Sequence, residues 1–111
     1  MSSDLIIVTA QSFIRSVNRL SKKYPSLPSD LASLRETLNA NPHSGDSLGK
    51  NCYKVRMKIT SKATGKTGGA RVITLVKIEL NRITLLDIYD KSEKETVTDK
   101  ELAELIKKAE G

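Results

Sequence analysis

The sequence predicts an α+β fold, in which a mainly antiparallel four-stranded sheet carries an N-terminal helical hairpin packed on one face and a C-terminal helix. Three observations predict this β-α-α-β-β-β-α order. Two helical stripes follow a short apolar run, three strand-like segments come next, and a capped amphipathic helix ends the chain. A chain of 111 residues is long enough for one core, so we expect residues 1–111 to form a single domain.

The N-terminal part predicts one strand and two helices. Residues 5–8 are apolar and rich in β-branched side chains, which favours a buried strand. A first helix, capped by Thr9, should stop before Pro25, and a second should end at Asn41 and Pro42. Apolar side chains recur at helical spacing in both, namely Phe13, Ile14, Val17 and Leu20 in the first helix and Leu27, Leu31, Leu34 and Leu38 in the second. We expect both apolar stripes to be buried by packing on the sheet.

Residues 52–59 alternate strictly, as in a strand with one face on a core and the other in water. The core side carries Tyr53, Val55, Met57 and Ile59, and the wet side carries Cys52, Lys54, Arg56 and Lys58. Three positive charges therefore stand in a row, each about 6.6 Å from the next at strand spacing. Because like charges in a row cost energy, we interpret this strand, over residues 51–60, as the floor of an anion site.

The segments around this strand complete the predicted sheet. Residues 43–51 read as a polar loop, and residues 61–69 as a flexible cationic hairpin loop. Residues 70–80 are apolar on both faces, which favours a central strand, and residues 83–89 form the last strand of an antiparallel meander. Thr98 and Glu101 match a capping box that opens the final helix, whose apolar face consists of Leu102, Leu105, Ile106 and Ala109.

The positive charge of the chain is concentrated in one segment. Residues 47–78 contain eight Lys and Arg residues and no Asp or Glu, whereas the other 11 basic residues share the rest of the chain with all 13 acidic ones. A protein that meets a polyanion on one face shows this distribution. The pattern therefore favours nucleic-acid binding over a merely solvated basic surface.

Cationic chemistry on RNA needs no metal, because the ribose 2′-OH is an internal nucleophile beside the scissile phosphate. One Cys, one His and no paired carboxylates near the basic strand give a metal site no support, and we expect no cofactor. The reaction needs a base, a stabiliser of phosphate charge and an acid. Neighbouring charges suit Lys54 to the role of base, and the forked guanidinium groups suit Arg56 and Arg71 to charge stabilisation.

The order of elements and three motifs resemble the RelE superfamily of bacterial type II toxin–antitoxin toxins (the RelE/ParE family). The motifs are Leu48-Gly49-Lys50-Asn51-Cys52-Tyr53-Lys54-Val55-Arg56, Gly69-Ala70-Arg71-Val72-Ile73 and Ile88-Tyr89-Asp90-Lys91-Ser92-Glu93-Lys94-Glu95. The resemblance covers nearly the whole chain and implies a RelE-like toxin domain. It further implies a metal-independent, ribosome-dependent mRNA endonuclease, or mRNA interferase, which inhibits translation by cutting mRNA in the ribosomal A site. A cognate antitoxin, which we expect to be acidic, would neutralise it.

The resemblance assigns catalytic positions to Lys54, Arg56, Arg71 and Lys91. Arg71 stands beside Gly68 and Gly69 at the start of its strand, so we expect its side chain to reach past the sheet edge and its loss to change stability little. The remaining lysines of the basic face are expected to bind RNA, namely Lys50, Lys58, Lys62, Lys66 and Lys94. The sequence departs from the family where many members carry a catalytic Tyr or His, since Val97 and Thr98 stand there.

Two other functions remain open, a non-catalytic ParE-type toxin acting on DNA gyrase and a plain nucleic-acid-binding module. The single Cys and the lack of a signal peptide or membrane-length apolar run predict a cytoplasmic protein with no membrane partner. We expect the free toxin to be a monomer that forms a hetero-oligomer with its antitoxin. Its other partners would be mRNA and the ribosomal A site.

Overall fold

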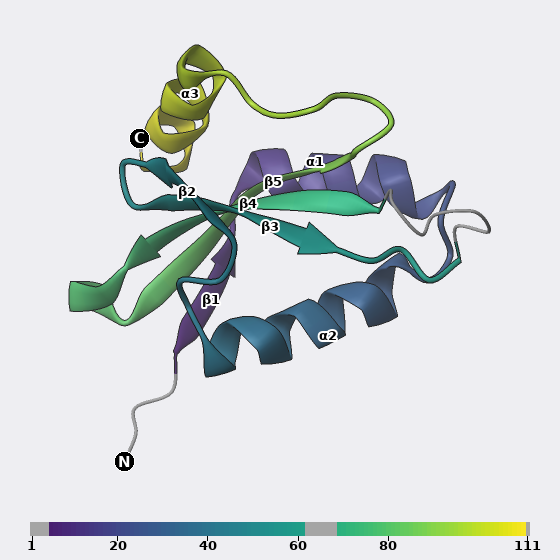
Figure 1. The fold of residues 1–111 in the computed structure, drawn as a ribbon, viewed down its shortest axis with the longest axis horizontal. Helices are drawn as coiled ribbons and strands as arrows, with labels where there is room; N and C mark the ends of the chain where they lie inside the picture. Colours follow the sequence, from purple (N-terminus) through teal and green to yellow (C-terminus); the bar gives the residue numbers. More distant parts are fainter. Residues whose placement is uncertain (1–4, 62–68, 111) are drawn as a thin grey trace.

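The computed structural model describes residues 5–61 and 69–110, which fold around one sheet with strand order β1-β5-β4-β3-β2 (Figure 1). The elements are β1 (Ile6–Thr9), α1 (Gln11–Ser21), α2 (Leu27–Ala40), β2 (Asp46–Gly49), β3 (Cys52–Met57), β4 (Ala70–Lys77), the 3₁₀ turn η1 (Ile78–Leu80), β5 (Arg82–Asp90) and α3 (Asp99–Glu110). β1 runs parallel to β5, and all other neighbouring strands are antiparallel. The predicted α+β class is confirmed.

The sheet separates two hydrophobic layers, with α2 and α3 on opposite sides of it (Figure 1). On one side Leu27 and Leu38 of the helical hairpin pack with Val55 and Met57 of β3. On the other side Leu102 of α3 packs with residues of β3, β4 and β5, among them Cys52, Ile73, Leu75 and Tyr89. The alternation predicted for β3 is confirmed for the apolar parity, which faces the hairpin core. The expectation that the other parity faces water is wrong for Cys52, because the α3-side core buries it completely.

A fifth strand, β2, forms where the sequence predicted only a loop. Asp46 lies opposite Lys54 in the antiparallel pairing of β2 with β3. The turn between these strands holds Lys50 at φ 55° and Asn51 at φ 64°, and two consecutive positive φ angles are what a two-residue hairpin turn requires. Asp, Ser and Gly have low strand propensity, so local sequence hid a strand that pairing with β3 creates.

Three local expectations are wrong. β1 is an edge strand rather than a buried one, and three of its four residues are exposed. The strand predicted to reach residue 80 ends at Lys77, where η1 begins. Thr9 does not cap α1, whose N-cap is Ala10 without a side-chain cap.

The predicted capping box of α3 is confirmed. The Thr98 N–H donates to Glu101 Oε1 at 2.8 Å, and the Glu101 N–H donates to Thr98 Oγ1 at 3.1 Å.

Asp30 in α2 ties the helical hairpin to the end of β3. Its Oδ1 accepts from the Thr60 hydroxyl at 2.6 Å, and its Oδ2 accepts from the Thr60 N–H at 3.0 Å and from the Ser26 hydroxyl at 2.7 Å. Burial raises the pKa of Asp30, but the hydrogen bonds from Thr60 and Ser26, with the charge of Lys58, outweigh it and hold the pKa below its ordinary value of 3.8.

We expect Asp30→Asn to lower the free energy of unfolding at neutral pH by about 1–3 kcal/mol, because an amide cannot accept all three hydrogen bonds. The folded-state pKa is depressed, so this contribution is present above the unfolded-state pKa and is lost as pH falls through the lower folded-state value. Urea unfolding at pH 7 and at pH 3 measures both stabilities. The difference between wild type and variant should narrow at pH 3, and an equal difference at both pH values would contradict the charged role.

Candidate functional site

One pocket of about 160 Å³ gathers all four residues that the sequence singled out as catalytic, Lys54, Arg56, Arg71 and Lys91. They come from β3, from β4 and from the residue that follows β5. In the strand register Arg56 lies directly opposite Arg71. Two guanidinium groups on facing positions of a sheet repel each other, and a bound anion relieves that repulsion. The geometry thus builds a small anion pocket.

Arg71 is more deeply placed than the sequence indicated. β4 is the central strand of the sheet, and the Arg71 side chain is only 6% exposed. Its Nη1 donates to the Ala70 carbonyl oxygen at 3.1 Å. The expectation that Arg71 reaches past the sheet edge is therefore wrong. Because the side chain is buried on the central strand, we now expect its loss to lower stability.

Lys91 is brought to the pocket by the end of β5. Its N–H donates to the Gly69 carbonyl oxygen at 2.9 Å, which fixes its backbone beside the start of β4. The neighbouring Asp90 is fully buried and accepts from the Tyr24 hydroxyl at 2.5 Å and from the Ser92 N–H at 3.0 Å. The hydrogen bond to Asp90, with burial, raises the pKa of Tyr24 to about 12, so this hydroxyl remains a donor at neutral pH. Hydrogen bonds of its own backbone and of the buried neighbour Asp90 thus position Lys91.

Two carboxylates that sequence reasoning missed, those of Asp46 and Glu95, line the same pocket. Asp46 lies just before the acid-free segment, and the β2–β3 hairpin folds it back opposite Lys54. The Lys50-Asn51 turn between two short segments was the signal that could have revealed it. The pocket therefore contains carboxylates, which can accept protons, as well as Lys and Arg side chains, which can bind a negatively charged group.

The segment that carries Glu95 also contacts the predicted base. Lys54 Nζ donates to the Thr96 hydroxyl at 3.3 Å. Arg19 of α1 pairs with Glu93 at 2.8 Å, which holds the segment against the helical hairpin. Val97 is buried against the α3-side core, and Thr98 caps α3. The two positions where the sequence departs from the family pattern therefore have structural roles.

Tyr89 is the aromatic residue opposite Arg71 in β5. Its hydroxyl is buried and, among the described residues, makes no hydrogen bond of standard geometry, although Thr96 is near enough to affect its pKa. Burial raises that pKa more than Thr96 and Arg71 lower it, so the hydroxyl stays protonated at neutral pH. Tyr89 does not line the pocket and instead carries Lys94 Nζ 5.1 Å from its ring centre.

The three described lysines that were predicted to bind RNA, Lys50, Lys58 and Lys94, do not line the pocket with the catalytic four. Lys50 lies in the β2–β3 turn, about 20 Å along the strand from Arg56 at strand spacing. Lys58 follows β3 and acts electrostatically on Asp30, and Lys94 pairs with Glu101 at 3.4 Å. Lys62 and Lys66 lie outside the described residues.

Comparison with solved structures decides the fold. A double-arginine mutant of the E. coli toxin RelE in the free state matches with a TM-score of 0.57, covering 96% of this chain and 95% of that chain. This chain has a RelE-like fold. At 14% sequence identity the likeness is one of fold, and no family model or curated protein matches the sequence.

Among residues 5–61 and 69–110, no group of three or more His, Cys, Asp or Glu side chains is placed to hold a metal ion. None of the helices described there is long and apolar enough to span a membrane.

Proposed function

We propose that this protein is the toxin of a type II toxin–antitoxin pair and a metal-independent endoribonuclease that cuts mRNA on the ribosome. The observation that carries the proposal is the pocket, where four cations from three parts of a RelE-like fold meet two carboxylates. Anion binding alone would not need carboxylates in the pocket, whereas phosphoryl transfer needs both charge stabilisation and proton transfer.

The pocket residues fit each part of RNA cleavage. The ribose 2′-oxygen attacks phosphorus and forms the O2′–P bond while the P–O5′ bond breaks, leaving a cyclic phosphate and a 5′-hydroxyl. Arg56 and Arg71 stabilise the charge that grows on the phosphate oxygens. A carboxylate or Lys54 takes the 2′-OH proton, and Lys91 or Lys54 gives a proton to the O5′ leaving group.

The same pocket supports dependence on the ribosome. None of its described lining residues is aromatic, although proteins that bind single-stranded RNA by themselves stack bases on aromatic rings. Its volume is about 160 Å³, and Lys, Arg, Asp and Glu side chains form its described lining. A pocket that contacts only the RNA backbone binds mRNA more effectively when a partner positions the mRNA beside it. The ribosomal A site is such a partner.

The neutralising antitoxin is proposed to be acidic, because an exposed cationic pocket attracts carboxylate-rich segments. The free toxin is proposed to be a cytoplasmic monomer that forms a hetero-oligomer with this antitoxin.

Induced expression in bacteria, followed by mapping of mRNA ends, tests the function. Translation arrest with cuts in ribosome-bound mRNA is expected. A DNA-damage response with intact mRNA would replace the proposal by the gyrase-directed alternative, and normal growth with intact mRNA would favour a plain binding module. Purified protein that has been treated with EDTA, and then freed of EDTA by gel filtration, should cleave mRNA on programmed ribosomes as fast as untreated protein, which tests for a tightly bound metal.

Asp46→Asn is expected to lower the cleavage rate about 10²-fold if Asp46 is the base, because an amide cannot take the 2′-OH proton. Glu95→Gln is the matched variant in the same pocket, and the carboxylate that is not the base should tolerate its change within about threefold. Single-turnover cleavage on programmed ribosomes measures both rates. Unchanged rates in both variants would leave Lys54 as the base.

A further inference from the structure

The residues that follow β5 form a tight turn held by Asp90, the last residue of that strand. The Glu93 N–H donates to the Asp90 carbonyl oxygen at 2.8 Å, and the Ser92 N–H donates to Asp90 Oδ1 at 3.0 Å. An Asp side chain that accepts from the backbone two residues later forms an Asx turn, which fixes the direction of the chain. This turn presents Lys91 to the cationic pocket.

Asp90 is fully buried, which the turn by itself does not require. Asx turns form readily on exposed surfaces, whereas a buried carboxylate is costly unless hydrogen-bond donors satisfy it. The second carboxylate oxygen, Oδ2, accepts from the Tyr24 hydroxyl at 2.5 Å. With one oxygen bonded to the turn and the other to Tyr24, the carboxylate cannot rotate without losing a buried hydrogen bond.

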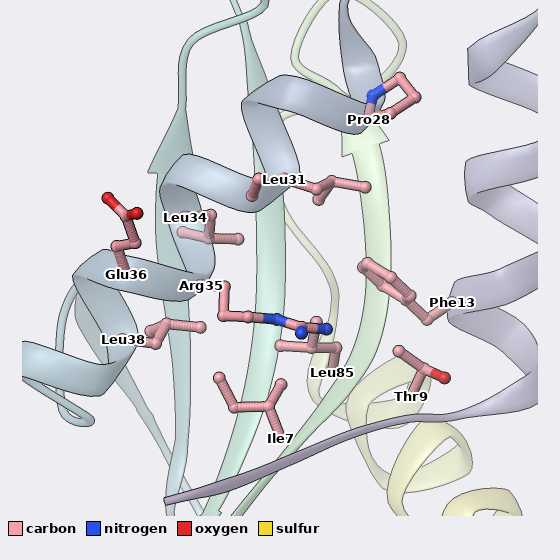
Figure 2. A pocket seen from close by; sticks show the side chains of 11 residues that line it. Ile7, Thr9, Phe13, Pro28, Leu31, Leu34, Arg35, Glu36, Leu38 and Leu85 are labelled. Carbon is pink, nitrogen blue, oxygen red and sulfur yellow. The ribbon is translucent and has the colours of Figure 1, made fainter.

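Tyr24 is itself anchored in the helical hairpin, 66 residues away from Asp90 in the chain. Its side chain is 6% exposed and packs in the core that also contains Phe13, which extends from α1 into the pocket beside α2 (Figure 2). Its N–H donates to the Leu20 carbonyl oxygen at 2.9 Å, and its carbonyl oxygen accepts from the Leu27 N–H at 3.1 Å. The hairpin therefore fixes the Tyr24 hydroxyl, and Asp90 connects that hydroxyl to the turn.

A second contact joins the same turn to the hairpin. Arg19 of α1 pairs with Glu93 at 2.8 Å, but their side chains are 54% and 38% exposed. Exposed ion pairs contribute little, because water and salt screen them. The buried hydrogen bond between Tyr24 and Asp90 is therefore the contact able to set the geometry of the turn.

We propose that Tyr24 is a positioning residue for the cationic pocket, because its hydroxyl, acting through Asp90, fixes the turn that places Lys91. Neither Tyr24 nor Asp90 lines the pocket, so neither contacts the bound anion. The proposal requires only that the pocket binds a phosphate group, whereas its effect on RNA cleavage rests on the proposed function. Cations placed in advance stabilise phosphate charge without reorganising, and a misplacement of about 1 Å can cost about 10²-fold in rate.

Tyr24→Phe tests the proposal, because it removes the hydroxyl and keeps the ring in the core. Ser16→Ala is the matched control, since the Ser16 hydroxyl of α1 also donates to a β5 carboxylate, Asp87 Oδ1 at 2.6 Å, and neither residue lines the cationic pocket. Amide exchange of the full-length protein is followed by NMR. Exchange at Ser92 should become at least about fivefold faster in Tyr24→Phe and stay unchanged in Ser16→Ala. Exchange in the central strand β4 reports global unfolding, so acceleration confined to the turn shows local loosening.

Inorganic phosphate is the probe for the pocket itself. It is titrated into each protein at low ionic strength while the amide resonances of Arg71 and Lys91 are followed. Tyr24→Phe should bind phosphate about threefold more weakly than wild type, and Ser16→Ala should bind it equally. On programmed ribosomes, kcat for mRNA cleavage should fall about tenfold in Tyr24→Phe and stay unchanged in Ser16→Ala.

Asp90→Asn tests whether Tyr24 acts through Asp90, because an amide has one acceptor oxygen where a carboxylate has two. In a protein that already carries Asp90→Asn, adding Tyr24→Phe should weaken phosphate binding no further. A full additional threefold loss would show that Tyr24 acts by another route. If circular dichroism shows that Asp90→Asn does not fold, the comparison of Tyr24→Phe with Ser16→Ala decides alone.

Unchanged exchange at Ser92 in Tyr24→Phe would overturn the proposal, and so would a phosphate affinity equal to that of wild type. Equal losses in Tyr24→Phe and Ser16→Ala would reduce Tyr24 to a general contribution to stability. Wild-type protein that fails to bind phosphate would also overturn it, because no anion site would then exist to be positioned. Wild-type protein that binds phosphate but cuts no mRNA would instead count against the proposed function alone.

Discussion

Replacing Arg71 with alanine is expected to slow mRNA cleavage about 10²–10³-fold, the usual effect of removing one donor that stabilises transition-state charge. The variant should also lose about 1–3 kcal/mol of unfolding free energy, because the arginine stem is buried on the central strand. The two losses have different causes, since the first requires the guanidinium group and the second mainly requires the stem.

Arg71→Met separates these causes, because it keeps most of the stem and removes the charge. Single-turnover cleavage on programmed ribosomes and urea unfolding are measured on both variants, with Lys107→Ala in the last turn of α3 as a control distant in sequence from the pocket residues. We expect Arg71→Met to recover stability but not cleavage. Full cleavage by either folded Arg71 variant would remove Arg71 from the proposed site.

Gly45→Ala is expected to destabilise the fold by about 2–4 kcal/mol. Gly45 has φ +98°, which L-residues rarely adopt, and an added Cβ would overlap the backbone carbonyl of Lys54. The nearest atoms are backbone rather than the end of a flexible side chain, so the backbone at Gly45 or at Lys54 must shift. Since Lys54 lines the pocket, cleavage should fall as well.

Gly49→Ala provides the matched control, because Gly49 has a similar φ of +82° but no atom within 4 Å of an added Cβ. The Gly49→Ala change should lower the free energy of unfolding by only about 1 kcal/mol, which is the penalty of the left-handed conformation itself. Urea unfolding of the two variants compares them directly. Equal losses would show that conformation rather than contact with Lys54 sets the cost at Gly45.

Strong local patterns determined most of the fold from sequence. The alternation in residues 52–59 fixed which side of β3 faces the helical hairpin, because a strand places successive side chains on opposite faces. The capping box fixed the start of α3, because both of its hydrogen bonds join residues three apart in the chain. The acid-free stretch also identified the segment that contributes Lys54, Arg56 and Arg71 to the pocket.

Only the tertiary structure decided what lies beside these residues. Asp46 belongs to a strand with weak local propensity that exists because β3 offers it hydrogen bonds, so strand propensity alone did not predict its place opposite Lys54. Arg71 is buried because β4 lies at the centre of the sheet, which depends on strand order rather than on its neighbours in the chain. The apolar run of β1 had the composition of a buried strand, yet burial requires neighbours on both edges, and the sheet supplies β1 with only one.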